Sequence, residues 1–226
     1  MKYLKFLGWD PAYKSLAHSY ISLNVDIFCD ILKADTARDI LNLLSEFMIV
    51  HSWGVVDLLP GKKISDQSEV ARTIALRKYL DGMIIDPETV VVIEHQAIKM
   101  SGLAAVNSHS SIVSHQIAYH YARTHTVEFI DPKLKNNIVI GDIKCQGKKY
   151  SDRKAHTRKL FDHIARVFRL HTDVKRANID DLADSLMSVF AHCNKYNLIV
   201  IPDNYHLICE LLEAVNAQLS RSCDNL

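Results

Sequence analysis

The sequence predicts an α/β fold in a single domain, and three observations lead to this expectation. Short apolar stretches of strand character alternate with amphipathic helical segments, which is typical of mixed α/β proteins. Residues 89–94 (TVVVIE) form a run of β-branched residues without alternation, as expected for a strand covered on both faces. The 226 residues contain no internal repeat or Pro/Gly-rich linker and are enough for one sizeable core.

The first half of the chain is expected to supply three strands and two helices. Residues 2–10 and 15–23 have strand patterns separated by the turn PAYK, which indicates a hairpin. The next elements expected are a helix within 35–50, a strand at 51–59 and a helix at 65–83. The buried side of this last helix is expected to include Val70, Ile74, Leu76 and Leu80.

The second half is expected to supply two strands and four helices. After the strand at 89–94, the pattern predicts a helix at about 103–125, a strand at 126–130, a helix at 152–170, a helix beginning after Asn178 and a closing helix at 206–219. Residues 133–149 are a polar, Lys-rich connection. The helix at 152–170 is basic and carries an apolar stripe of Leu160, Phe161, Ile164 and Val167.

The helix that follows Asn178 contains two closely spaced aspartates. The Asn178 side chain is expected to cap this helix by accepting a hydrogen bond from a backbone N–H. Asp181 and Asp184 are three residues apart, so their carboxylates share one helix face. Carboxylates this close repel unless a cation lies between them or one keeps its proton. The positive end of the helix dipole explains carboxylates at Asp180 and Asp181, but Asp184 lies a full turn further into the helix. The buried stripe is expected to be Leu182, Leu186, Val189 and Phe190.

Two further acids end predicted strands. Asp10 ends the first strand and Glu94 ends the strand at 89–94. Sites in open α/β sheets form at the carboxyl ends of the strands, so these acids and the pair Asp181 and Asp184 can form one set of hard oxygen ligands. Mg²⁺ prefers such ligands. Two such ions about 3.5–4 Å apart activate a water and stabilise the leaving oxygen in phosphodiester cleavage.

Charge is distributed unevenly along the chain. Residues 133–176 hold thirteen Lys/Arg and four Asp, a balance of +9, so the remainder carries −8 to give the net charge of +1. This asymmetry favours a face that binds a polyanion, although a solvated basic helix and loop is the simpler alternative.

Other classes are excluded by composition. No apolar run reaches the roughly 20 residues of a membrane helix, and Met1 leads directly into a strand pattern without a signal peptide. The five cysteines are scattered, and no pair among the twelve histidines has zinc-ligand spacing. We therefore expect an intracellular, soluble protein without structural zinc or membrane association.

The order of these motifs resembles that of the RNase H-like nucleases. Their local sequences resemble those of the RuvC-type Holliday junction resolvases, including the resolvases of large DNA viruses such as poxviruses. LGWDPAYKSLAHS is similar to the first family motif, VVVIEHQAIKM to the second and IDDLADSLMSVFAH to the last. The resemblance spans roughly residues 3–195. It implies one RNase H-like nuclease domain over 1–226, with a mixed five-stranded sheet flanked by helices on both faces. An insertion at about 24–50, a helical extension at about 195–226 and Ala12 in place of a glycine depart from the bacterial members.

The resemblance also implies which residues form the site. The metal ligands are expected to be Asp10, Glu94, Asp181 and Asp184, with Asp180 as a substitute for Asp181, and to hold two Mg²⁺ ions, with Mn²⁺ tolerated. The catalytic lysines are expected to be Lys135, with Lys133 as its competitor, and Lys154; each stabilises charge on the scissile phosphate or simply contacts phosphate. The expected DNA contacts are Gln96, Lys133, Lys144, Lys148, Lys149, Arg153, Arg158 and Lys159.

The function that the resemblance implies is a metal-dependent endodeoxyribonuclease that resolves Holliday junctions or other branched DNA by paired symmetric nicks. A four-way junction presents two equivalent strands, so we expect a homodimer, with the helix at 103–125 as its interface by analogy. The expected setting is DNA recombination, repair or viral DNA replication, inside a host cell or a virion if the chain is viral.

Three alternatives stay open at this point. One is another RNase H-like nuclease that cuts RNA–DNA hybrids or flaps, recognised by A-form geometry and 2′-hydroxyl contacts. A second is a non-catalytic nucleic-acid-binding module on the same fold, which gains nothing from four carboxylates facing phosphate. A third is an actin-like sugar kinase or ATPase, for which seven glycines and no Gly-rich phosphate loop are unfavourable.

Overall fold

A computed structural model of the chain describes residues 3–12, 15–26, 42–43, 46–61, 68–96, 108–138, 143–145, 147, 149–167 and 178–198. Most of the 24–50 insertion and the expected closing helix at 206–219 lie outside these ranges. Within them, no helix combines the length and the apolar character needed to cross a lipid bilayer.

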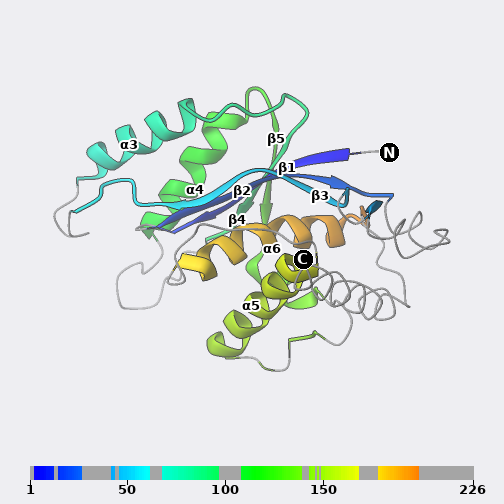
Figure 1. Cartoon of the computed structure of the whole chain (residues 1–226). Helices are drawn as coiled ribbons and strands as arrows, with labels where there is room; N and C mark the ends of the chain where they lie inside the picture. Colours follow the sequence, from blue (N-terminus) through cyan, green and yellow to red (C-terminus); the bar gives the residue numbers. More distant parts are fainter. Residues whose placement is uncertain are drawn as a thin grey trace, which may run out of the picture.

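A five-stranded mixed sheet with the strand order β3-β2-β1-β4-β5 forms the centre of the molecule (Figure 1). The strands β1 (Tyr3–Pro11), β2 (Leu16–Asn24) and β3 (Met48–Val56) form an antiparallel meander. On the other side of β1, the strands β4 (Val90–Glu94) and β5 (Thr126–Ile130) run parallel to it. This is the RNase H-like arrangement, so the expected fold class is confirmed.

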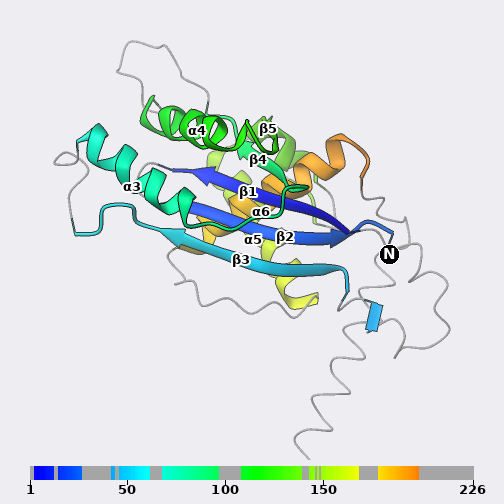
Figure 2. The same cartoon turned by 90° about the horizontal axis from the view of Figure 1, so that it is seen from above.

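Helices cover both faces of the sheet (Figures 1 and 2). One face carries α3 (Glu69–Asp81) and α4 (Ser108–Tyr121). On the opposite face α6 (Ile179–Lys195) packs against β1 and β2, and α5 (Tyr150–Val167) packs against α6. A short 3-10 helix, η2 (Pro132–Asn137), follows β5 in the stretch expected to be an irregular connection.

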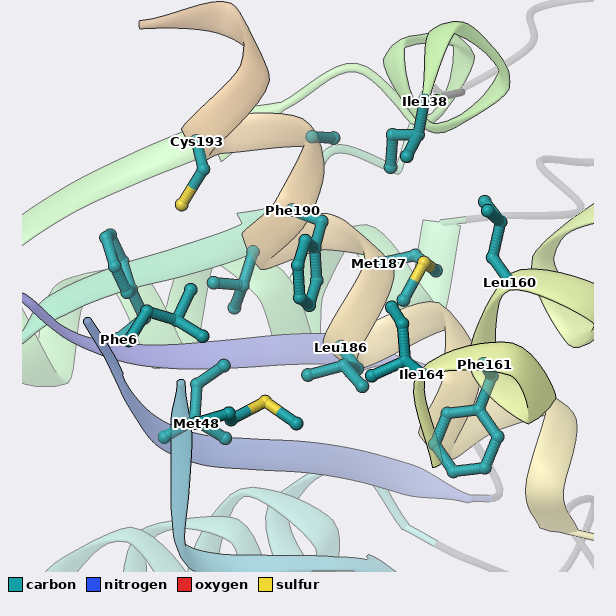
Figure 3. Packing of buried hydrophobic residues seen from close by; sticks show 14 of the residues in the cluster. Phe6, Met48, Ile138, Leu160, Phe161, Ile164, Leu186, Met187, Phe190 and Cys193 are labelled. Atoms are coloured by element: carbon teal, nitrogen blue, oxygen red, sulfur yellow. The ribbon is translucent and has the colours of Figure 1, made fainter. Parts of the chain in front are cut away.

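The alternation of side chains along β1 divides the core into two parts. Phe6 is fully buried on the α6 side, together with Leu186 and Met187 of that helix (Figure 3). Leu7 and Trp9 are fully buried on the opposite side, under α3 and α4. Because burial is complete on both sides, β1 is an interior strand, and its carboxyl end is held in place from two directions.

Gly8 allows α6 to approach the sheet closely. A Cβ atom placed on Gly8 would lie 2.4 Å from the backbone oxygen of Ser185 and 2.7 Å from Cγ2 of Val189. On the helix, the Ser185 hydroxyl donates to the Leu182 carbonyl at 2.8 Å, so this small residue is buried without an unpaired hydroxyl. The contact lies two residues before Asp10 on the same face of β1, and it therefore sets how near α6 comes to that acid.

The expected boundary between the helix at 35–50 and the third strand is wrong, and so is the expected capping hydrogen bond of Asn178. The third strand begins at Met48 and ends at Val56, so residues 48–50 are strand rather than helix, because the antiparallel pairing with β2 continues from Leu23 opposite Met48. Asn178 precedes α6, but its side chain makes no capping hydrogen bond among the described residues.

The expected buried face of α3 is half wrong. Leu76 and Leu80 are buried, but Val70 and Ile74 are 69% and 63% exposed. The buried line instead continues through Arg72, four residues before Leu76. An apolar pattern alone does not distinguish this arrangement from one in which Val70 and Ile74 face inward.

Replacing Gly8 with Ala is expected to lower the free energy of unfolding by about 1–3 kcal/mol, because the added methyl overlaps the backbone oxygen of Ser185, which cannot turn away as a flexible side chain can. Urea denaturation followed by circular dichroism measures this difference. The matched control is Gly54→Ala in β3, whose added Cβ meets only the His18 ring at 3.5 Å. Equal stability of the two variants would show that α6 is free to move away from β1.

Candidate active site

Five acidic residues line one cavity of about 540 Å³, and four of them, from three elements, are the expected metal ligands. Asp10 and Glu94 lie side by side at the carboxyl ends of the parallel strands β1 and β4, where Trp9 pairs with Ile93. The first turns of α6 supply Asp181 and Asp184. We call this space the acidic cavity. Its other lining residues are Ala12, His95, Gln96, Ser110, Asp131, Pro132, Lys133, Lys135, Asn136, Tyr150, Arg153, Lys154 and Thr157.

Two lysines neutralise the acidic cluster. Lys135 of η2 donates from Nζ to Glu94 and, at 2.8 Å, to Oδ1 of Asp184. Lys154 of α5 donates to the other carboxylate oxygen of Asp184. Lys135, rather than its competitor Lys133, therefore reaches the carboxylates, and both lysines expected to be catalytic contact the acidic cluster.

Burial and charge shift the pKa values of the cluster in opposite directions. Burial raises the pKa of Asp10 well above its usual range, and the neighbouring Glu94 and Asp184 raise it further. Burial acts in the same direction on Asp184, but Lys135 and Lys154 outweigh it and lower the pKa of that carboxyl. Burial disfavours the ammonium groups too, yet the surrounding carboxylates raise the pKa of both lysines. At neutral pH both lysines therefore carry a positive charge, and Asp184 carries a negative charge.

The two remaining aspartates of α6 have different partners. Asp181 accepts a hydrogen bond of 2.5 Å from the Ser15 hydroxyl at the end of the first hairpin. Asp180 forms a two-pronged ion pair with Arg158, at 2.7 Å to Nε and 2.6 Å to Nη2. Asp180 is also absent from the lining of the acidic cavity. The register of α6 therefore favours Asp181 over its substitute Asp180.

The donors of the acidic cavity suit a hard divalent cation in their chemistry. All four are carboxylates, and the buried Asp10 carboxylate receives no hydrogen bond from the described residues. Among those residues, however, no three His, Cys, Asp or Glu side chains are gathered into a ready metal site. The two lysines hold the carboxylates instead, and these would have to turn toward an ion.

Basic and amide side chains expected to contact DNA fall into three groups. Gln96, Lys133 and Arg153 line the acidic cavity. Lys144, Lys149 and Lys159 are exposed outside it. Arg158 is engaged with Asp180, and Lys148 lies outside the described residues. The cavity therefore has a basic rim of its own, with further lysines at the surface beyond it.

The sequence matches a known family over most of its length. A family profile described as "Poxvirus A22 protein" matches residues 27–194. The chain belongs to the poxvirus A22 protein family. This membership confirms the resemblance to the poxvirus-type, RuvC-like resolvases that the motifs indicated. The second and third motifs lie within the matched residues, whereas Asp10 precedes them.

Several solved structures are similar to this A22 family protein. Fowlpox virus resolvase, solved with its Holliday junction substrate, is 14% identical with a TM-score of 0.47, over 85% of this chain and 99% of that one. RuvC of Thermus thermophilus is 11% identical with a TM-score of 0.47, over 85% and 96% of the two chains. The same enzyme with a Holliday junction substrate gives 10% identity and a TM-score of 0.46 over the same shares. A search of curated proteins gives no match.

Asp131 in the acidic cavity and Ser15, which contacts Asp181, were not expected from the sequence of this A22 family protein. Asp131 follows β5, so it carries the same strand-end signal that identified Asp10 and Glu94. Its carboxylate accepts the backbone N–H of Lys133 at 2.8 Å and so caps η2. Ser15 gave no signal, since its partner is 166 residues away in the chain.

Replacing Asp10 with Asn is expected to stabilise the metal-free A22 family protein at neutral pH. A buried carboxyl with a raised pKa costs stability once pH rises above its unfolded value near 3.8, and the cost grows up to the folded pKa. Asn cannot ionise. Thermal denaturation in EDTA should therefore give a Tm a few degrees above that of the unsubstituted protein at pH 7, and equal values near pH 4.

Two further variants complete this test. Asp184→Asn should lower the Tm at pH 7, because a carboxyl with a lowered pKa stabilises the fold above its unfolded value and loses that effect as pH falls. Glu88→Gln removes an exposed carboxylate outside the cavity and should change nothing. A lower Tm for Asp10→Asn at pH 7 would contradict the charge balance described above.

Proposed function

We propose that this chain is a metal-dependent, structure-selective DNA endonuclease that resolves Holliday junctions by paired nicks. The observation that carries the proposal is the acidic cavity, in which Asp10, Glu94, Asp181 and Asp184 converge from β1, β4 and α6. A module that only binds nucleic acid has no use for four carboxylates facing phosphate. Membership of the poxvirus A22 family and the resolvase-like order of the motifs support the same reaction.

The four carboxylates would hold two Mg²⁺ ions, with Mn²⁺ tolerated. Such ions would supply an activated water and stabilise the leaving oxygen of the cleaved phosphodiester. Asp10 would hold a cation as the carboxylate, because a nearby positive charge favours that form.

The two lysines have different roles. Lys135 has a side chain that is only 7% exposed, so it positions Glu94 and Asp184 from inside. Lys154, at 24%, is closer to solvent and faces the DNA, where it stabilises the negative charge that builds on the scissile phosphate. Lys133 and Arg153 on the rim hold the flanking phosphates.

The working unit is a homodimer with one acidic cavity for each of two opposed strands. A two-fold enzyme matches the two equivalent strands of a four-way junction. The interface is formed by α4, which exposes Ile112 and Tyr119 at 44% and 73%. The family members that cut DNA junctions supply the analogy for this choice of helix.

The substrate is tested with a labelled synthetic four-way junction, a linear duplex of the same sequence and an RNA–DNA hybrid, each incubated with Mg²⁺ or EDTA. We expect symmetric nicks near the branch of the junction in Mg²⁺ alone. Cleavage of the hybrid instead would support the proposed active site but contradict the proposed substrate. Junction binding without cleavage in either Mg²⁺ or Mn²⁺ would leave only a binding module.

The carboxylate assignment is tested by Asp10→Asn and Asp184→Asn. Each removes a ligand without removing a basic contact, so cleavage should fall by at least about 100-fold, whereas junction affinity measured by gel shift should stay within a few-fold. Asp57→Asn, an exposed aspartate outside the cavity, is the control and should cleave normally. Full activity in Asp184→Asn would refute the assignment, and the stabilised Asp10→Asn separates loss of chemistry from loss of fold.

A further inference from the structure

The first turn of α5 presents three side chains to the acidic cavity. Tyr150, Arg153 and Lys154 are spaced at i, i+3 and i+4, so they lie on one face of the helix, and all three line the cavity. Lys154 reaches Asp184 and belongs to the site already described. Tyr150 and Arg153 contact none of the four carboxylates among the described residues, and their arrangement requires another explanation.

Tyr150 is a large aromatic residue with little cover. It is 68% exposed, although it lies at the wall of the acidic cavity. The guanidinium carbon of Arg153 lies 5.9 Å from the centroid of its ring, within the range of a cation–π contact. The ring therefore has a cation on one side, while most of its surface is left for a ligand.

Arg153 has unused donor capacity. Its Nε atom is buried and has no hydrogen-bond acceptor among the described residues. A guanidinium is suited to a phosphate, which accepts from two of its N–H groups at once. An aromatic ring beside such a group is the combination by which proteins hold single-stranded nucleic acid, with bases stacked on the ring and phosphates paired with the cation.

The position of Tyr150 fits a nucleotide close to the bond that is cut. Side chains four residues apart on a helix have Cβ atoms roughly 5–6 Å apart, so Tyr150 lies about one turn from Lys154 at the carboxylate cluster. Successive nucleotides of one strand are about 3.4 Å apart along the helix axis. A base on the Tyr150 ring would therefore belong to a nucleotide close to the scissile phosphate, because Tyr150 and Lys154 line the same cavity.

We propose that Tyr150 and Arg153 form a base-stacking subsite that takes a nucleobase flanking the scissile phosphate at a DNA branch. Inside a continuous duplex, both faces of each base are covered by its neighbours. At a branch the stack is interrupted, and the flanking base has a free face for the Tyr150 ring. The subsite therefore distinguishes branched from linear DNA without contacts to base edges. This inference rests on the proposed nuclease function and names the feature of the DNA that is recognised, which is the free face of a base at the branch.

The test compares Tyr150→Ala with Tyr150→Phe. Base–aromatic stacking contributes about 1–3 kcal/mol, so Tyr150→Ala should cleave the four-way junction about 5- to 150-fold more slowly at limiting enzyme. Tyr150→Phe retains the ring and should stay within about two-fold of the unsubstituted protein. Residual nicking of linear duplex should respond equally little to both changes.

A fluorescent base gives a readout independent of activity. The adenine analogue 2-aminopurine, placed next to the expected nick in a junction, is quenched when it stacks on an aromatic ring. In the uncut complex of the Asp10→Asn protein we expect quenching, which Tyr150→Ala abolishes and Tyr150→Phe preserves. The matched control is Tyr196→Leu, which removes another tyrosine paired with a cation, Lys195 at 4.6 Å, outside the acidic cavity.

Three results would overturn the subsite: unchanged quenching in Tyr150→Ala, equal losses in Tyr150→Ala and Tyr150→Phe, or an equal loss in Tyr196→Leu. Failure of the nuclease function has a different signature, because the unsubstituted protein then cuts no junction in Mg²⁺ or Mn²⁺. The quenching comparison tests the subsite in that case as well.

Discussion

The ion pairs of Lys135 with Glu94 and Asp184 are the interaction on which the rest of the site depends. Acidic side chains this close repel one another when ionised, and the positive charge of the lysines offsets that repulsion. Lys135 lies on η2 and Lys154 on α5, so neutralisation also ties these two helices to β4 and α6. The electrostatic requirement of the site and the packing of the fold are therefore met by the same contacts.

Close packing of α6 on β1 is the second condition for the geometry of the site. The absence of a side chain at Gly8 brings α6 onto β1, and residues 182–193 of that helix are buried throughout. Asp184 is consequently held in a rigid, buried turn rather than in a loop. Its position near Asp10 follows from the contact of this helix with the sheet.

The sequence predicted the elements of the site better than their contacts. Asp10, Glu94 and Asp184 were identified because strand ends and helix periodicity are local signals, and the structure brings these three residues to one cavity. The choice between Asp180 and Asp181, or between Lys133 and Lys135, depends on contacts with Arg158, Ser15 and Glu94 that are distant in the sequence. Local patterns carry no information about such partners. The exposed Val70 and Ile74 were misassigned for the same reason, since the side of α3 that faces inward depends on packing against elements distant in the chain, such as α4.

The outward side of α3 has a practical consequence. Val70 and Ile74 are largely exposed, and α3 lies on the face of the sheet opposite α6 and the carboxylates that it supplies (Figure 1). A cysteine introduced at either position would carry a dye or a surface tether without disturbing either half of the core. If the acidic cavity holds DNA as proposed, α3 therefore gives an attachment point away from that cavity for single-molecule observation.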